Sequence, residues 1–180
     1  MTLTAEQKTA IETEFKQWTE LQYAGKDKKE RQKLGQFFTP PPLTIKMLEK
    51  FDTVKDKDIL DPTVGAGGLL VACILCGADP KRCYGIELDL AILKVCRRRL
   101  LKYGVPPWHL KEGNALESAS YEFEQDNIKT FATVDRLAEA IVLTVVNCNK
   151  VIMTKTYTDK DGLKKALKSL KSKDVKIYKI

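Results

Sequence analysis

A glycine-rich segment that begins with Asp61, followed by Glu87 twenty residues after Gly67, is the part of this sequence best suited to chemistry. Residues 61–68 read Asp-Pro-Thr-Val-Gly-Ala-Gly-Gly and directly follow a short apolar stretch. Gly65 and Gly67 permit backbone conformations and a close ligand approach that side chains would block. The helix expected next offers free N–H groups and a positive dipole end to an anionic group. Glu87, at the end of the next apolar stretch, can accept hydrogen bonds from both hydroxyls of a ribose. The pattern predicts a site for an adenosine-containing cofactor, and the alternative is a tight strand-to-helix turn with an acid on the surface.

Four short segments in a fixed order carry a family resemblance. They are GQFFTP at 35–40, DPTVGAGGLL at 61–70, GIELD at 85–89 and GNAL at 113–116. The glycines do not form the dinucleotide-binding pattern G-x-G-x-x-G, because Gly68 directly follows Gly67. Together the segments resemble the N6-adenine DNA methyltransferases, especially the modification subunits of type I restriction systems. The resemblance covers about residues 30–117.

The resemblance implies S-adenosylmethionine (SAM) as the cofactor. The residues that it assigns to cofactor binding are Phe37, Phe38, Thr39, Asp61, Thr63, Gly65, Gly67, Glu87, Leu88 and Asn114. Residues 37–39 would pack on the methionine part, where aromatic faces can attract the sulfonium cation. Without the surrounding motifs, the two phenylalanines would be interpreted as ordinary core.

Each acid and amide has its own implied role in that family. Asp61 would meet the amino group of the cofactor, and Thr63, Gly65 and Gly67 would line its backbone path. Glu87 would bind the ribose, while Leu88 would flank the adenine. Asn114 stands where the family usually has an aspartate that accepts from the adenine amino group, and an amide carbonyl can still accept that bond.

The catalytic motif of the family is missing from the expected place. That motif is Asn or Asp, then Pro-Pro, then an aromatic residue, and it follows the fourth strand; it holds the flipped base and accepts from its amino group. Pro106-Pro107-Trp108 lacks the polar residue and precedes the third expected strand. Asn147 follows an apolar stretch but has neither prolines nor an aromatic residue beside it, so it is the one candidate remnant. Only 64 residues follow Leu116, which predicts a shortened methyltransferase core.

Other residues able to do chemistry have ordinary structural interpretations. Cys73 and Cys76 form C-x-x-C inside an apolar helix without a second ligand pair, so we expect core thiols and no metal site. His109 alternates with apolar neighbours in an expected strand and is interpreted as structural. Arg97–Arg99 are expected on a solvated helical face, with a nucleic-acid contact as the alternative.

The order of the expected elements indicates an α/β protein. We expect a Rossmann-like SAM-dependent methyltransferase core, truncated, with a doubly wound, mostly parallel sheet and a helix before it. The expected parts are an N-terminal helix and basic linker at 1–34, the core at 35–146, and a lysine-rich strand-helix-strand tail at 147–180. A capping box at Thr4 and Gln7 begins the first helix. Residues 134–146 could form a helix, a strand, or one after the other.

The charge of the chain is concentrated at its end. The net charge is +7, and residues 150–180 hold ten lysines against three aspartates, which accounts for all of it. Such a tail can contact a phosphate backbone, or it can be a solvated face. Five cysteines, no apolar stretch of membrane-spanning length and no visible signal peptide lead us to expect a cytoplasmic protein.

Three functions follow from these features. The first is methyl transfer from SAM to adenine N6 in DNA, with a partner subunit as a possible source of the catalytic loop or the specificity domain. The second is a catalytically inactive SAM-binding module that binds nucleic acid or protein, for example in anti-restriction or regulation. The third is methylation of RNA or of a protein glutamine, which the GQFFTP segment disfavours.

Overall fold

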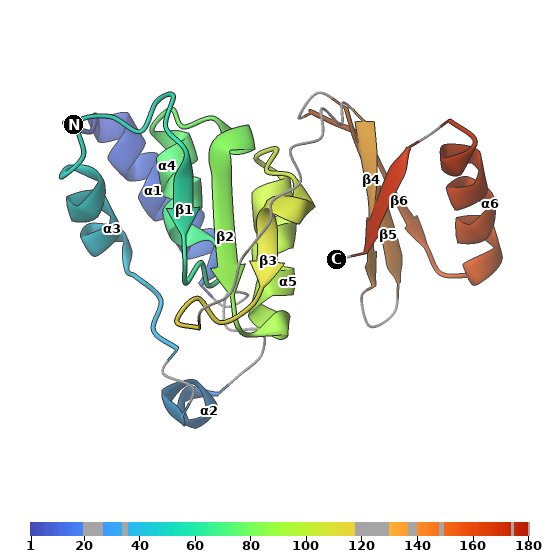
Figure 1. Cartoon of the computed structure of the whole chain (residues 1–180), viewed down its shortest axis with the longest axis horizontal. Coiled ribbons are helices and arrows are strands. Elements are labelled where there is room, and N and C mark those ends of the chain that lie inside the picture. The colour runs from blue at the N-terminus through green and yellow to red at the C-terminus, as the bar shows by residue number, and fades with distance from the viewer. Residues whose placement is uncertain are drawn as a thin grey trace. The chain divides into compact units, whose positions relative to one another are not determined.

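The computed structural model describes residues 1–19, 27–33, 36–117, 130–136, 140–147, 150–173 and 175–179. The chain divides into two compact units, Met1–Phe123 and Glu124–Ile180 (Figure 1). This division differs from the boundary expected at 146/147, because the strands before that point pair with the strands after it. Gly35, the first residue of the GQFFTP segment, and residues 118–129 lie outside the described residues.

The first unit contains a three-stranded parallel sheet. Its strands are β1 (Ile59–Asp61), β2 (Cys83–Glu87) and β3 (Leu110–Glu112), in the order β1-β2-β3. The register places Asp61 beside Gly85 and Glu87 beside Glu112. The crossovers run through α4 (Gly68–Leu75) and α5 (Leu90–Leu101), and both helices lie on the same face of the sheet (Figure 1). Two right-handed crossovers that progress in one direction require this placement.

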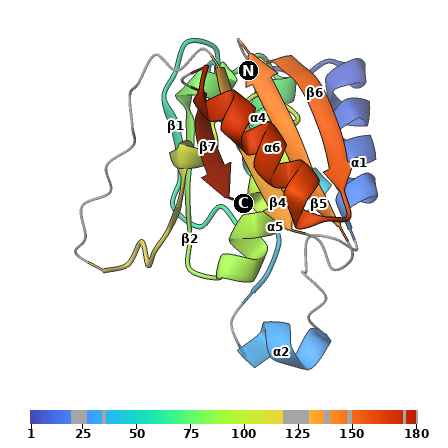
Figure 2. The same ribbon diagram turned by 90° about the vertical axis from the view of Figure 1, so that its right-hand side faces the viewer.

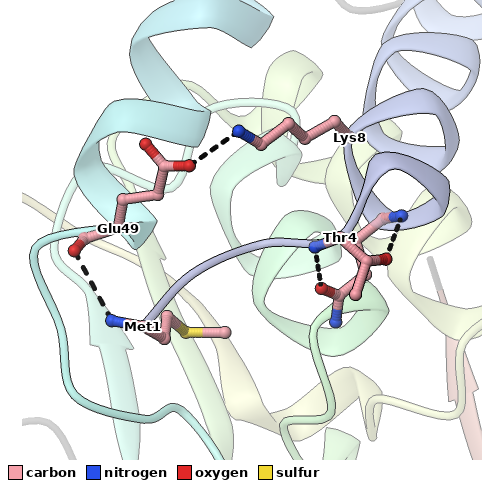
Figure 3. Close-up of polar contacts among 5 residues, drawn as sticks. Met1, Thr4, Lys8 and Glu49 are labelled. Carbon is pink, nitrogen blue, oxygen red and sulfur yellow. Dashed lines mark hydrogen bonds and ion pairs between the residues drawn. The ribbon is translucent and has the colours of Figure 1, made fainter.

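Three further helices belong to the first unit. These are α1 (Ala5–Trp18), α2 (Lys28–Lys33) and α3 (Pro41–Leu48). The expected capping box is confirmed, since the Gln7 N–H donates to Thr4 Oγ1 at 3.2 Å and the Thr4 N–H donates to Gln7 Oε1 at 2.9 Å. Figure 3 shows how α1 is joined to the end of α3: Lys8 pairs with Glu49 at 2.8 Å, and the Met1 amino group donates to the Glu49 carbonyl. The basic segment expected as a linker contains α2, a helix that buries no residue.

The core of the first unit lies between the sheet and its helices. Its fully buried members include Ile11, Leu48, Leu70, Leu93 and Leu110. Four free cysteines are also buried, at positions 73, 76, 83 and 96. Burial raises the pKa of the Cys73 and Cys83 thiols to about 12, so they stay protonated and pack as small apolar groups. The interpretation of Cys73 and Cys76 as core thiols is confirmed.

The second unit is a four-stranded sheet with one helix. Its strands are β4 (Thr130–Arg136), β5 (Ile141–Asn147), β6 (Lys150–Tyr157) and β7 (Lys176–Lys179), in the order β6-β5-β4-β7. Among the described strands of this unit, only the pair β4–β7 is parallel. Helix α6 (Lys160–Lys171) crosses this sheet (Figure 2) and packs Leu163 against a core that includes Ala132, Leu143 and Tyr157.

The prediction of a doubly wound, mostly parallel sheet is confirmed in part. The α/β class and the parallel arrangement of the first strands are confirmed, and the fold is compatible with a Rossmann-like core. The described parts of 134–146 do not extend that sheet, however, because residues 134–136 fall in β4, residues 141–146 fall in β5, and these two strands pair antiparallel in the second unit. The third strand also begins later than expected, since Pro107–His109 form a 3-10 turn and β3 starts at Leu110. Among the described residues, no helix has the length and apolar character needed to cross a bilayer.

His109 is a structural residue of the first unit, as its neighbours indicate. Its side chain is buried, its Nδ1 lies 3.2 Å from the Cys83 carbonyl, and its ring stacks on Tyr84 at 4.5 Å between centroids. Because a carbonyl only accepts, Nδ1 carries the proton of the neutral ring. Burial lowers the pKa of His109 to about 4, well below the usual value for an unfolded chain of about 6.5.

We predict that His109 makes the protein less stable in acid. The unfolded chain binds a proton between the two pKa values, so the contribution of His109 is complete above about pH 6.5 and is lost as the pH falls towards about 4. Replacing His109→Gln should therefore cost stability at pH 7.5 but regain about 2–3 kcal/mol relative to wild type at about pH 4.5. Urea unfolding at both pH values measures the difference. A wild-type-to-variant difference that does not change with pH would contradict the prediction.

Candidate functional site

A cavity of about 680 Å³ lies at the carboxyl ends of the three parallel strands. This is the edge at which open α/β sheets bind ligands, and the volume is within the usual range for small-molecule sites. Its lining residues come from α1, from the segment before α3, from the turn after β1 and the start of α4, from α5, and from the ends of the three strands. They are Phe15, Gln36, Phe37, Phe38, Thr39, Asp61, Pro62, Thr63, Val64, Gly65, Ala66, Gly68, Leu69, Glu87, Leu88, Asp89, Ile92, Arg99, Gly113, Asn114, Ala115 and Leu116.

The glycine-rich turn forms one wall of this cavity. Gly65 and Gly67 have φ of +53° and +80°, a region that side chains other than glycine rarely enter. A Cβ at Gly65 would also lie 2.9 Å from a ring carbon of Phe38, so the turn and that aromatic ring are packed as closely as glycine allows. Gly67 precedes α4 without a side-chain cap, which leaves the first N–H groups of the helix open to a ligand.

Glu87 joins the turn to the end of β2. Its Oε2 accepts from the Gly65 N–H at 2.9 Å, and its Oε1 accepts from the Asp89 N–H at 2.8 Å. The carboxylate thus fixes two loops, because each of its oxygens accepts from a backbone N–H of a different one. An acid at this point is part of the turn as well as part of the cavity wall.

Asp61 is the second acid in the cavity, and it is 9% exposed. Its Oδ1 accepts from the Thr63 N–H at 3.1 Å. Burial raises the pKa of Asp61, and the nearby charge of Glu87 raises it further. Because the negative charges of Asp61 and Glu87 repel each other, a cationic ligand between or beside the two carboxylates would be favoured.

The segment before α3 closes the cavity from another side. Gln36 Nε2 donates to Asp89 Oδ2 at 2.7 Å, while Asp89 Oδ1 caps α5 by accepting from the Ala91 N–H at 2.9 Å. Gln36 Oε1 is buried with no hydrogen-bond partner among the described residues. A buried acceptor without a donor is costly, so this oxygen suits an N–H group of a bound molecule.

A buried ion pair supports the turn at the side where α5 borders the cavity. Arg99, 1% exposed, donates from Nε to Glu14 Oε1 at 3.1 Å and from Nη1 to the Ala66 carbonyl at 3.3 Å. The guanidinium carbon lies 5.2 Å from the ring centroid of Phe15 and 5.5 Å from that of Trp18. The expectation of a solvated face for Arg97–Arg99 is wrong for Arg99, because α1 covers that side of α5.

The comparison with known families adds one finding. The profile of the N-6 DNA Methylase family matches residues 18–137, two thirds of the chain. The chain belongs to the N-6 DNA methylase family. No curated protein and no solved structure matches it. At the level of the family, this supports a function related to methyl transfer and DNA methylation, and the resemblance drawn from the four sequence segments is confirmed.

The structure brings most of the sequence-predicted residues to one cavity. Phe37, Phe38, Thr39, Asp61, Thr63, Gly65, Glu87, Leu88 and Asn114 line it, and Gly67 lies in the adjoining turn without lining it. Phe37 is 81% exposed, whereas Phe38 packs against Trp18, Ala66 and Val95. The Asn114 carbonyl oxygen already accepts from the Leu116 N–H at 3.1 Å, so one of its two lone pairs is used.

Other predicted and unpredicted residues complete the description. Asn147 is exposed at the end of β5, in the second unit, and is not among the residues that line the cavity. The sequence predicts no role for Gln36, Asp89 or Glu14, and it predicts a solvated position for Arg99. Gln36 and Asp89 lie within the recognised segments, so their position in the sequence could have indicated a place in the site. No local pattern in the sequence indicates that Glu14 pairs with Arg99. Among the described residues, no group of three His, Cys, Asp or Glu side chains is placed to hold a metal ion.

We predict that the Glu14–Arg99 pair is needed to hold the turn in place. Replacing Arg99→Met removes the bond to Ala66 and leaves the Glu14 carboxylate buried without its partner, which should cost about 3–5 kcal/mol. The double variant Glu14→Met, Arg99→Met should recover at least half of that loss, because no buried charge remains. Urea unfolding of the two variants and the wild type checks both statements. If Arg99→Met were as stable as wild type, the pair would not be needed to stabilise the turn.

Proposed function

We propose that the cavity of the first unit binds SAM and that the protein acts in methyl transfer to the N6 of adenine in DNA. The family membership supports the reaction class. The single observation that carries the proposal is the meeting of Asp61 and Glu87 beside a glycine-rich turn at the carboxyl edge of the sheet. Bound there, SAM would supply an activated methyl group.

The residues of the cavity fit the charges of this cofactor. SAM carries an ammonium group and a sulfonium, and Asp61 and Glu87 offer negative charge to cations. Gln36 Oε1 offers a buried acceptor, and the Phe38 ring offers an aromatic face for a cation. The open N–H groups at the start of α4 suit the carboxylate of the methionine part. Each charged part of the cofactor therefore has a complementary group in the lining.

Recognition of the methyl acceptor has weaker support in these residues. The sequence contains no Asn or Asp followed by Pro-Pro and an aromatic residue. Without such acceptors for the amino protons, alignment of the target base would lose most of its contribution to the rate. We propose that a partner subunit supplies the catalytic loop or the specificity domain.

This same absence favours a second candidate function. In it, the protein is a catalytically inactive SAM-binding module that acts by binding nucleic acid or protein, for example as an anti-restriction or regulatory component. Both candidates require the cavity to bind SAM, and they differ only in methyl transfer.

We predict that Asp61→Asn lowers the affinity for SAM about 10- to 100-fold, the usual range for losing a hydrogen bond to a charged group. Asparagine keeps the size and the acceptor for the Thr63 N–H but not the charge that faces the ammonium. Calorimetry should show that binding of 5′-methylthioadenosine, which lacks the amino-acid part, is unchanged. The matched control is Asp52→Asn, at an exposed carboxylate outside the cavity.

The same variant should change the pH dependence of binding. Wild-type affinity should fall as the pH drops towards the raised pKa of Asp61, because the neutral acid no longer attracts the ammonium. Asp61→Asn should not show this decline. Equal losses for SAM and methylthioadenosine would contradict the placement of the amino group at Asp61.

A transfer assay decides between the two candidate functions. Purified protein is incubated with SAM labelled in the methyl group and with unmethylated duplex DNA, and the label is sought on adenine. We expect SAM binding by calorimetry, and transfer only when the missing acceptor residues are supplied by a partner. Transfer by the chain alone would remove the second candidate, and absence of SAM binding would overturn the proposed function itself.

A further inference from the structure

Helix α6 presents a row of lysines on the second unit. Lys160, Lys164, Lys168 and Lys171 are exposed, and we call them the α6 lysine stripe. On another side of the helix, Leu163 is buried, and Ala166, Leu167 and Leu170 pack on the core of that unit. The apolar contacts fix the orientation of α6 on its sheet (Figure 2), so the stripe is a stable feature of the surface.

The spacing of the stripe makes it narrow and straight. At 3.6 residues per turn, positions 160, 164, 168 and 171 fall within an arc of about 80°. With a rise of 1.5 Å per residue, the stripe extends for about 16 Å. Duplex DNA carries one negative charge per about 1.7 Å of its axis, so a phosphate lies within reach of each lysine along that length.

Among the described residues of α6 and the turn before it, the two aspartates do not neutralise the stripe. Residues 150–180 contain ten lysines and three aspartates. Asp159 Oδ1 accepts from the Gly162 N–H at 2.7 Å and so caps the helix. Asp161 lies 3.5 Å from Lys164, but the two side chains are 88% and 76% exposed, and such pairs contribute little. The surface therefore keeps a net positive charge.

We propose that the α6 lysine stripe contacts the phosphate backbone of double-stranded DNA. Lysine ammonium groups act as point charges that bind phosphate without reading bases. Helix α6 contains no aromatic residue and no arginine, which are the groups that stack on the bases of single strands. The choice of DNA as the polyanion rests on the proposed function, whereas the choice of duplex rests on the composition of the stripe.

Binding of a labelled 24-base-pair duplex to the full chain tests this inference, with fluorescence anisotropy measured from 50 to 300 mM NaCl. The test variant is Lys164→Gln, Lys168→Gln, Lys171→Gln. It should bind about 10-fold or more weakly at 100 mM NaCl, and the slope of log K against log salt should fall by about 2–3, near 0.9 per lost phosphate contact. The sequence of the duplex should not matter.

Two matched variants isolate the position and the charge. Lys46→Gln, Lys50→Gln, Lys55→Gln removes three exposed lysines from the first unit and should keep affinity within about threefold of wild type. Lys164→Arg, Lys168→Arg, Lys171→Arg keeps the charge and should keep the affinity, even if the glutamine variant folds poorly. Equal losses in the two glutamine variants would overturn the inference, as would equally tight binding of a single strand of the same length.

The outcome can be separated from that of the proposed function. Calorimetry with SAM on the same preparations should give equal affinities for the wild type and the α6 variant. Duplex binding through the stripe without SAM binding would leave this inference standing and overturn the proposed function. SAM binding without any duplex binding would do the reverse.

Discussion

The turn between β1 and α4 is the element on which the rest of the first unit depends. Its chain must pass through left-handed backbone at Gly65 and Gly67, and so it has few side chains of its own with which to pack. Three consecutive residues are instead held from outside. The Val64 N–H donates to the Ile86 carbonyl at 2.9 Å, the Gly65 N–H donates to Glu87, and the Ala66 carbonyl accepts from Arg99.

These three bonds explain why polar groups are buried near an apolar core. Burying the Glu14–Arg99 pair costs desolvation, and apolar residues of similar volume would often stabilise a core as well. A carbonyl in a turn without side chains, however, needs a donor that reaches it across the helix interface. The guanidinium supplies that donor and packs its faces on Phe15 and Trp18. The buried pair therefore costs free energy of folding, but it fixes the position of the cavity wall.

Local patterns predicted the elements whose signals are contained in a few residues. The capping box at Thr4, the glycine-rich turn and the position of Glu87 each depend on residues close together in the sequence, and the structure has them as expected. Residues 134–146 could not be assigned, because a short, mostly apolar stretch fits a strand or a helix equally well. The strand conformation is stabilised by antiparallel pairing, of β4 with β5 and of β5 with β6.

The candidate site divides in the same way. Side chains within the recognised segments line the cavity, as the sequence indicated. The pairing of Glu14 with Arg99 joins residues 85 positions apart, and three consecutive arginines look alike until α1 covers one of them. Bonds between distant elements leave no periodic trace in the sequence, which is why this support for the turn was missed.

The order of the strands bears on where the methyl acceptor is recognised. In a doubly wound sheet, the strand after the third one returns to pair beside the first, and helices then cover the second face. Here β4 pairs with β5 and β7, and β1 pairs only with β2 among the described residues. Leu60, in the middle of β1, is 54% exposed. The position beside β1, from which a fourth strand would carry a polar-Pro-Pro-aromatic loop to the cavity, is therefore not filled by any described strand.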